Sequence, residues 1–223
     1  MYIRLLILIC LIGPSLVFGQ AKGNIYFADR GEPKTFTGAF CLGFNFSQVD
    51  GDSYYGYHKV GLHVGGQVFA HLTSDFGVSM ELLYSRKGSR AVTVTESLMW
   101  GTYVWKYYMD VNYVEVPIMI HATTGRKWDL EAGASYGVLV NSNEYVVSDQ
   151  PVVITPDRNS FNRSDIDMVF GARRKLRNRL LGSVRYQYSL TSIRPTERIP
   201  VGYSYGNQGQ FNNLFTLRFE YLF

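Results

Sequence analysis

The stretch FTGAFCLGFNF, residues 36–46, places large apolar side chains at its even positions and small or polar groups at its odd positions. Successive side chains of a β-strand point to opposite faces. In an extended chain, Phe40 and Phe44 would therefore lie on one side, and Cys41 and Asn45 on the other. The stretch is predicted to be a strand with one bulky apolar face and one small or polar face.

The same alternation recurs along the chain and predicts an all-β fold. Aromatic residues make up 15% of the chain and charged residues 18%, which suits a β-rich chain better than a helical membrane protein. With residues 36–46, the alternating stretches number about eight, the even count expected of a single antiparallel up-and-down transmembrane β-barrel. The later stretches cover residues 59–72, 76–88, 113–122, 128–141, 165–173, 180–190 and 212–223.

The connections between these stretches alternate in length. Short turns are predicted near 73–75, 123–127 and 174–179, and long loops near 49–57, 89–104, 142–163 and 193–210. Outer-membrane barrels have short periplasmic turns at one rim and longer outer loops at the other. The pattern therefore predicts an outer-membrane protein of a diderm bacterium, with both termini on the periplasmic side.

The size of the side chains decides which face looks outward. The interior of an eight-stranded barrel is just wide enough for side chains to fill it, so the small and polar groups are predicted inside and the bulky groups outside, against lipid. A soluble ligand-binding barrel, with its apolar face inside, stays open as an alternative. The predicted lipid-facing residues are Phe40, Leu42, Phe44, Val64, Val116, Ile118, Phe219 and Tyr221.

Aromatic residues near the strand ends are predicted to form girdles at the two membrane interfaces, where Tyr and Trp are enriched. The members of these girdles would be Tyr84, Trp105, Tyr107, Trp128, Tyr186, Tyr188 and Tyr221.

The first residues have the features of a secretory signal peptide. A cation at Arg4 precedes a short apolar run, and small residues precede Gln20, so residues 1–19 are predicted to be removed. An uncleaved anchor is the alternative. Residues 20–34 would then form a polar periplasmic tail and residues 35–223 the barrel. The mature chain would keep one cysteine, Cys41, and hence no internal disulfide.

Most of the mature chain resembles the PorT-type outer-membrane β-barrel proteins. The resemblance implies a small outer-membrane barrel, a link in some members to type IX protein secretion, and no catalytic residues. The terminal Phe223 resembles the aromatic signal that the barrel-assembly machinery reads. The segments that carry the resemblance are GLHVGGQVFAHLTSDFGVSMELLYSRKGS (61–89), YVEVPIMIHA (113–122), LEAGASYGVLV (130–140), VRYQYSLTSI (184–193) and FEYLF (219–223).

Sequence matches to enzyme motifs fail on geometry, so no catalytic residue, metal site or cofactor is expected. GASYG, residues 133–137, lies in an alternating strand and lacks the strand-to-helix turn of a nucleophile elbow. In a predicted hairpin, Ser135 would lie about 20 Å along the strand from His121 and Asp129, too far for a catalytic triad.

Charged residues on the small face are predicted to meet across the lumen. Buried ions are tolerated when they are paired, so acidic residues on the third to fifth strands are expected to bind arginines on the seventh and eighth and to close the interior. Hydrated side chains lining a small passive pore are the alternative. The predicted network comprises Glu81, Glu115, Asp129, Glu131, Arg185, Arg218 and Glu220.

The sequence thus predicts a non-enzymatic barrel with a structural or scaffold role. Its expected partners are outer-membrane lipid, the barrel-assembly machinery during biogenesis and, as the resemblance implies, secretion-system proteins. Residues 20–34 are a candidate contact. The formal net charge of +4 is too small, and the basic residues too scattered, to indicate nucleic-acid binding.

Overall fold

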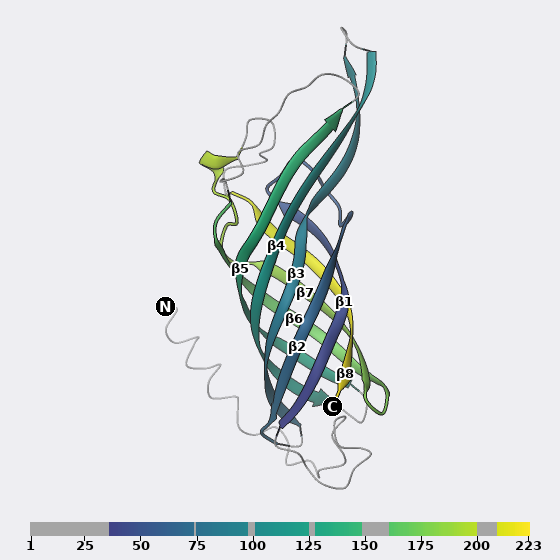
Figure 1. Ribbon diagram of the computed structural model, residues 1–223, viewed down its shortest axis with the longest axis vertical. Coiled ribbons are helices and arrows are strands. Elements are labelled where there is room, and N and C mark those ends of the chain that lie inside the picture. Colours follow the sequence, from purple (N-terminus) through teal and green to yellow (C-terminus); the bar gives the residue numbers. More distant parts are fainter. Residues whose placement is uncertain (1–35, 74, 98–100, 125–127, 149–160, 200–208) are drawn as a thin grey trace, which may run out of the picture.

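Eight antiparallel strands form one closed barrel, which confirms the predicted fold class (Figure 1). The computed structural model describes residues 36–73, 75–97, 101–124, 128–148, 161–199 and 209–223, so the predicted signal peptide and polar tail lie outside the described residues. The strands are β1 (Phe36–Asp50), β2 (Lys59–His71), β3 (Phe76–Ser97), β4 (Gly101–Thr124), β5 (Trp128–Ser148), β6 (Ser164–Arg177), β7 (Leu180–Ser189) and β8 (Phe211–Leu222), with one 3-10 turn, η1 (Thr196–Arg198).

The barrel closes where the first strand pairs with the last. β1 and β8 are antiparallel in a register that runs from Ala39↔Leu222 to Asp50↔Phe211. Closure leaves no free edge between β1 and β8, as a barrel in hydrocarbon requires. Within the described residues, no helix is both long enough and apolar enough to cross a membrane.

The two-residue period of the sequence becomes the division between outside and inside. Phe40, Phe44 and Phe219 point outward, with 50%, 54% and 59% of their surface exposed. Cys41 and Asn45, which alternate with the two β1 phenylalanines, are fully buried. The bulky face is therefore the outer surface of the barrel, and the small or polar face is its interior.

Three strands run well beyond the barrel, which corrects the predicted loops at 89–104 and 142–163. Residues 88–97, 101–110 and 143–148 of β3, β4 and β5 pair only with one another and form a three-stranded sheet, here called the extension. It projects past the rim that carries the long loops (Figure 1). The sequence AVTVT at 91–95 is rich in β-branched residues, which favour strands, and β4 is paired on both sides there by β3 and β5.

Short connections gather at the opposite end of the barrel, beside the C-terminus (Figure 1). At the β2–β3 turn the N–H groups of Leu72 and Thr73 donate to the carbonyl of Phe76. Two residues, Asn178 and Arg179, join β6 to β7. This end is called the short-turn rim.

Two of the predicted girdle aromatics face inward. Tyr107 is fully buried on the inward side of the extension, and Trp105 packs beside it and donates through Nε1 to the hydroxyl of Tyr54 at 3.1 Å. Both occupy odd positions of β4, and the odd positions from Tyr107 to Met119 of this strand face the interior. The girdle prediction was wrong for these two because it relied on residue type and ignored the period of the strand.

Candidate functional site

The lumen is the most chemically distinctive part of the molecule, because it buries many charged side chains. Inward-facing odd positions of β3 to β7 and even positions of β8 bring most of them together from strands far apart in sequence. They form three successive groups, named here by their cations: the arginine layer, the lysine layer and the Arg194 layer.

The arginine layer is centred on Glu81 of β3, which binds two arginines. Arg185 of β7 donates to it from Nη1 at 2.8 Å and from Nη2 at 2.6 Å, and Arg218 of β8 donates at 2.8 Å and 3.1 Å. Arg185 also donates from Nε to Glu131 of β5 at 2.5 Å. Arg218 binds Glu220 of its own strand at 2.8 Å. These bidentate contacts tie β3 and β5 to β7 and β8 across the interior.

Arg173 of β6 completes this layer. Its guanidinium lies 2.5 Å from Asp129 and 3.0 Å from Glu220, and it stacks 4.3 Å from the ring centre of Phe69. Nη2 also lies 2.5 Å from Nδ1 of His121. A guanidinium nitrogen can only donate, so Nδ1 accepts, and the other ring nitrogen of His121 is free to donate to the hydroxyl of Ser79 at 2.7 Å.

The lysine layer places one cation among three carboxylates. Lys87 of β3 lies 2.5 Å from Glu115, 2.9 Å from Asp167 and 3.8 Å from Asp165, and all four side chains are fully buried. Neutral donors supply further hydrogen bonds to the acids: the Gln187 amide donates to Asp167 at 2.7 Å. Ser189 and Asn212 donate to Asp165 at 2.9 Å and 2.8 Å.

The Arg194 layer closes the lumen toward the long-loop rim. Arg194 donates to both oxygens of Glu144, at 2.7 Å and 2.9 Å, and to Gln210 at 2.8 Å. The hydroxyl of Tyr107 donates to the same Glu144. A buried apolar cluster lies beside this layer and comprises Val49, Tyr107, Met109, Val111, Tyr113 and Ile193. The interior therefore also holds large residues, contrary to the expectation that only slim groups fit there.

The structure places all seven residues of the predicted network in the interior. Glu81, Asp129, Glu131, Arg185, Arg218 and Glu220 meet in the arginine layer, whereas Glu115 lies apart from them in the lysine layer. The sequence reasoning missed Lys87, Glu144, Asp165, Asp167, Arg173 and Arg194 as network members. The odd or even number of a position, here called its parity, could have identified Asp165, Asp167 and Arg173. All three occupy odd positions of one predicted strand and therefore share its inward face.

The residues predicted to face lipid lie on the outer surface. Phe40, Leu42, Phe44, Ile118, Phe219 and Tyr221 are between 48% and 59% exposed, and Val64 and Val116 are partly covered by neighbours. The terminal Phe223 packs its ring over Gly38 and donates its backbone N–H to the Gly38 carbonyl at 3.0 Å. The chain end is thereby held against the beginning of β1.

The side chains that could in principle act in catalysis or bind a metal take part in the packing and ion pairs of the interior. His121 contacts Asp129 at 3.3 Å, but both belong to the arginine layer, and Ser135 is buried without a hydrogen-bond partner in the structure. Within the described ranges, no group of three or more His, Cys, Asp or Glu side chains is arranged to hold a metal ion.

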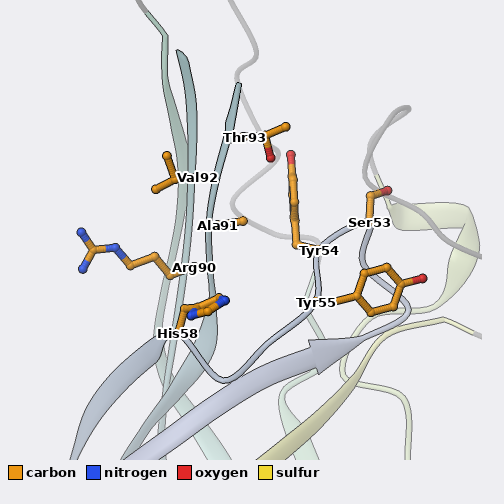
Figure 2. Close-up of a pocket in the computed structure, with 8 residues that line it drawn as sticks. All are labelled: Ser53, Tyr54, Tyr55, His58, Arg90, Ala91, Val92 and Thr93. Carbon is orange, nitrogen blue, oxygen red and sulfur yellow. The ribbon is translucent and has the colours of Figure 1, made fainter. Parts of the chain in front are cut away.

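A pocket of about 640 Å³ lies at the long-loop end, between the β1–β2 connection and β3 of the extension. Figure 2 shows Ala91 and Thr93 pointing toward the ring of Tyr54, while Arg90 and Val92 point to the other side of the strand. Tyr54 stacks on Tyr107 with 4.7 Å between ring centres. The pocket thus has one rigid aromatic wall and one strand wall, an arrangement suited to contact with a ligand or a protein loop.

Comparisons with known proteins give one family and several distant structures. A family model described as an outer membrane protein beta-barrel domain matches residues 11–194. The structure is similar to the attachment invasion locus protein Ail of Yersinia pestis, with 12% identity over 85% of this chain and 100% of that chain and a TM-score of 0.45.

Two other solved structures are also similar. Neisserial surface protein A has 9% identity over 85% of this chain and 98% of its own, with a TM-score of 0.45. OprG from Pseudomonas aeruginosa has 11% identity over 84% and 94%, with a TM-score of 0.27. No curated protein matches the sequence.

Proposed function

This chain belongs to the family of outer membrane protein β-barrel domains, and from that premise we propose that it is a closed, non-enzymatic barrel that anchors a binding platform in the outer membrane. The platform is the extension with the neighbouring pocket beside Tyr54. The barrel itself supplies a rigid, lipid-embedded support.

The observation that carries this proposal is the arginine layer. Arg185 and Arg218 reach from β7 and β8 to Glu81 on β3, and Arg185 also reaches Glu131 on β5, so the ion pairs span the interior. Opening a path through them would separate fully buried charges, and an unpaired buried charge costs several kcal/mol. These contacts support a lumen that is a core and not a channel.

A scaffold role fits the shape of the long-loop end. β3, β4 and β5 run together beyond the barrel (Figure 1) and raise a sheet and an aromatic pocket away from the membrane. Binding residues are commonly carried on segments that a rigid support holds in place. In the proposed orientation this platform faces the exterior, and the short-turn rim with the C-terminus faces the periplasm.

The resemblance to PorT-type barrels extends the proposal to protein secretion. On this view a component of a type IX secretion assembly binds the platform or the polar residues 20–34. Phe223 directly follows β8 and is exposed, like the outward-facing residues of that strand. It would serve as the signal for the barrel-assembly machinery.

Single-channel recording in planar bilayers tests the closed lumen. We expect no steady conductance from the wild type and leakage from Arg218→Ala, which leaves Glu81 and Glu220 with one fewer cation. Arg86→Ala is the matched control, since Arg86 is 44% exposed and pairs only distantly with Asp110, at 3.5 Å. A steady wild-type conductance would refute the closed lumen and favour a small passive pore.

Affinity capture from the native envelope tests the platform. A tagged wild-type chain should retain secretion components, and a variant with the extension shortened to a tight β3–β4 turn should lose them while it still assembles as a barrel. Equal capture by both chains would contradict the platform role.

A further inference from the structure

An apolar groove of about 510 Å³ runs along the outer wall of the barrel over β6, β7, β8 and β1. Its floor includes Ala172 and Gly182, the smallest outward residues there, and its sides include Phe44, Leu217 and Phe219. Small residues beside large ones leave a furrow in an otherwise bulky surface. The furrow lies on the face that meets the hydrocarbon, so it does not belong to the lumen or to the platform.

The furrow covers a large part of the depth of one leaflet. One end lies at the row in which Leu42 pairs with Phe219, Phe219 with Gly182, and Gly182 with Arg174. The other end lies at Phe46, four residues along β1 from Leu42. Four residues of a strand span about 13 Å, which at a strand tilt of about 40° is about 10 Å of depth, and one leaflet contributes about 15 Å of hydrocarbon, half of a core of about 30 Å.

Cations gather where the furrow reaches the short-turn rim. The sequence ARRKLRNR at 172–179 carries Arg174, Lys175, Arg177 and Arg179 around the β6–β7 turn. A second pocket of about 370 Å³ lies at this turn and is lined by Arg177, Asn178, Arg179, Leu180 and Tyr221. Among the residues that line the two pockets, none is acidic.

Arg174 and Trp128 mark the boundary between the apolar and the charged parts. The Arg174 guanidinium lies 5.1 Å from the ring centre of Trp128, and both residues line the furrow. Trp favours the membrane interface, and a guanidinium binds phosphate oxygens with two parallel hydrogen bonds. The end of the furrow therefore presents cations at the depth at which a lipid headgroup begins.

We propose that this furrow is a binding site for one anionic phospholipid, with an acyl chain along Ala172 and Gly182 and the phosphate on the basic turn at Arg177 and Arg179. Basic clusters at a membrane surface attract anionic headgroups, and the lining of the furrow matches a hydrocarbon chain. The site goes beyond the proposed function and does not depend on whether the lumen conducts.

Quenching of Trp128 by lipids brominated on the acyl chain tests the site directly. A chain with Trp100→Phe and Trp105→Phe keeps Trp128 as its only tryptophan. In phosphatidylcholine vesicles we expect stronger quenching by brominated phosphatidylglycerol or cardiolipin than by brominated phosphatidylcholine at equal content. Equal quenching by all of these lipids would overturn the proposal.

Two variants separate the two halves of the site. Arg177→Gln with Arg179→Gln should weaken the preference for the anionic lipid roughly fivefold for each cation removed, with quenching by phosphatidylcholine unchanged. Gly182→Leu, whose Cβ would lie 3.1 Å from the nearest atom, a methyl carbon of Leu176, should reduce the quenching of Trp128 by every lipid.

Gly66→Leu is the matched control for the furrow variant, because Gly66 is outward-facing on β2, outside the lining of the furrow, and the nearest atom to its added Cβ lies 3.9 Å away. All variants are compared only as folded barrels, judged by the shift in gel mobility on heating. The proposal fails if brominated lipids quench Trp128 equally in Gly182→Leu and Gly66→Leu. It also fails if the double arginine variant keeps the full preference for the anionic lipids.

Discussion

Single buried side chains hold the interior together, and Arg185 shows why the residue type matters. Its planar guanidinium binds Glu81 with two nitrogens and Glu131 with Nε and Nη2. A lysine at this position would be a point charge with one nitrogen and could not serve both carboxylates with this geometry. The side chain therefore binds two acids and fixes the distance between β3, β5 and β7.

We expect Arg185→Ala to lower the free energy of unfolding by about 3–5 kcal/mol, because it leaves Glu81 and Glu131 buried with fewer partners. Urea titration in lipid vesicles, followed by tryptophan fluorescence, would measure the change. The control is Arg86→Ala, which removes an exposed ion pair at 3.5 Å and should cost less than about 1 kcal/mol. Similar small losses in both variants would mean that water screens the charges of the lumen.

Asp52, in the loop after β1, should make stability depend on pH. It is buried, and burial raises the pKa of its carboxyl from 3.8 to about 7, against hydrogen bonds from Ser89 and the Tyr54 N–H that favour the ionised form. Between about pH 4 and pH 7 the folded chain thus holds a proton that the unfolded chain has lost. This contribution to stability falls as the pH rises through that window.

The measurement compares the free energy of unfolding at pH 5 and pH 8 in the wild type and in Asp52→Asn. The neutral amide cannot titrate, so the variant should lose less stability between the two pH values. An identical pH dependence of stability in both chains would show that folding does not raise the pKa of the Asp52 carboxyl.

At the scale of the strands, the seam between β1 and β8 decides whether the sheet becomes a barrel. Gly43 pairs with Arg218 across this seam. A Cβ built on Gly43 would lie 2.2 Å from the carbonyl oxygen of Leu217 and 2.6 Å from Cα of Arg218, and both are backbone atoms. The glycine allows the first and last strands to approach closely enough for the charged layers to form behind them.

Gly43→Ala should therefore destabilise the closed barrel by about 1–3 kcal/mol, the usual cost of inserting a methyl group into a packed site. The fraction of chain that migrates as a folded, heat-modifiable barrel on a gel should decrease. Gly66→Ala is the comparison, because the nearest atom to its added Cβ lies 3.9 Å away. If the two alanine variants fold equally well, then the close contact at Gly43 does not limit closure.

For the whole molecule, the two rims differ so much that the barrel has a defined direction. The short-turn rim carries the β2–β3 and β6–β7 turns and the C-terminus, and the opposite rim carries the extension (Figure 1). The same asymmetry places the basic turn and the proposed lipid site at one end and the pocket beside Tyr54 at the other. Orientation therefore decides which leaflet and which compartment each surface meets.

Cysteine labelling should reveal this orientation. A maleimide that cannot cross membranes should label Thr93→Cys, on the extension, in intact cells. It should label Asp75→Cys, at the β2–β3 turn, only after the outer membrane is permeabilised. Thr93 and Asp75 are exposed, Cys41 is buried, and Cys10 lies in the signal peptide that is predicted to be removed, so we expect the wild type to be the unlabelled reference. The reverse order of labelling would place the extension in the periplasm.

Local periodicity was enough to predict the fold class, because the direction of a side chain in a strand depends only on the parity of its position. The stretch at 36–46 separates its outward phenylalanines from Cys41 and Asn45 in the structure as in the sequence. Parity also carried the inward placement of Glu81 and Arg218. The same alternation, continued from the predicted strand at 113–122 back to Tyr107, indicates an inward side chain there, where the girdle prediction relied on residue type.

Only the tertiary structure decided which inward groups meet. Glu115 and Glu81 share a face of neighbouring strands, yet Glu115 binds Lys87 and Glu81 binds Arg185 and Arg218. Such partners depend on the register of every strand pair and on the tilt that barrel closure imposes. Both are properties of the whole sheet, and the sequence of a single strand does not determine them. The furrow beside Gly182 has the same origin, since it requires β1 and β8, from opposite ends of the chain, to lie side by side.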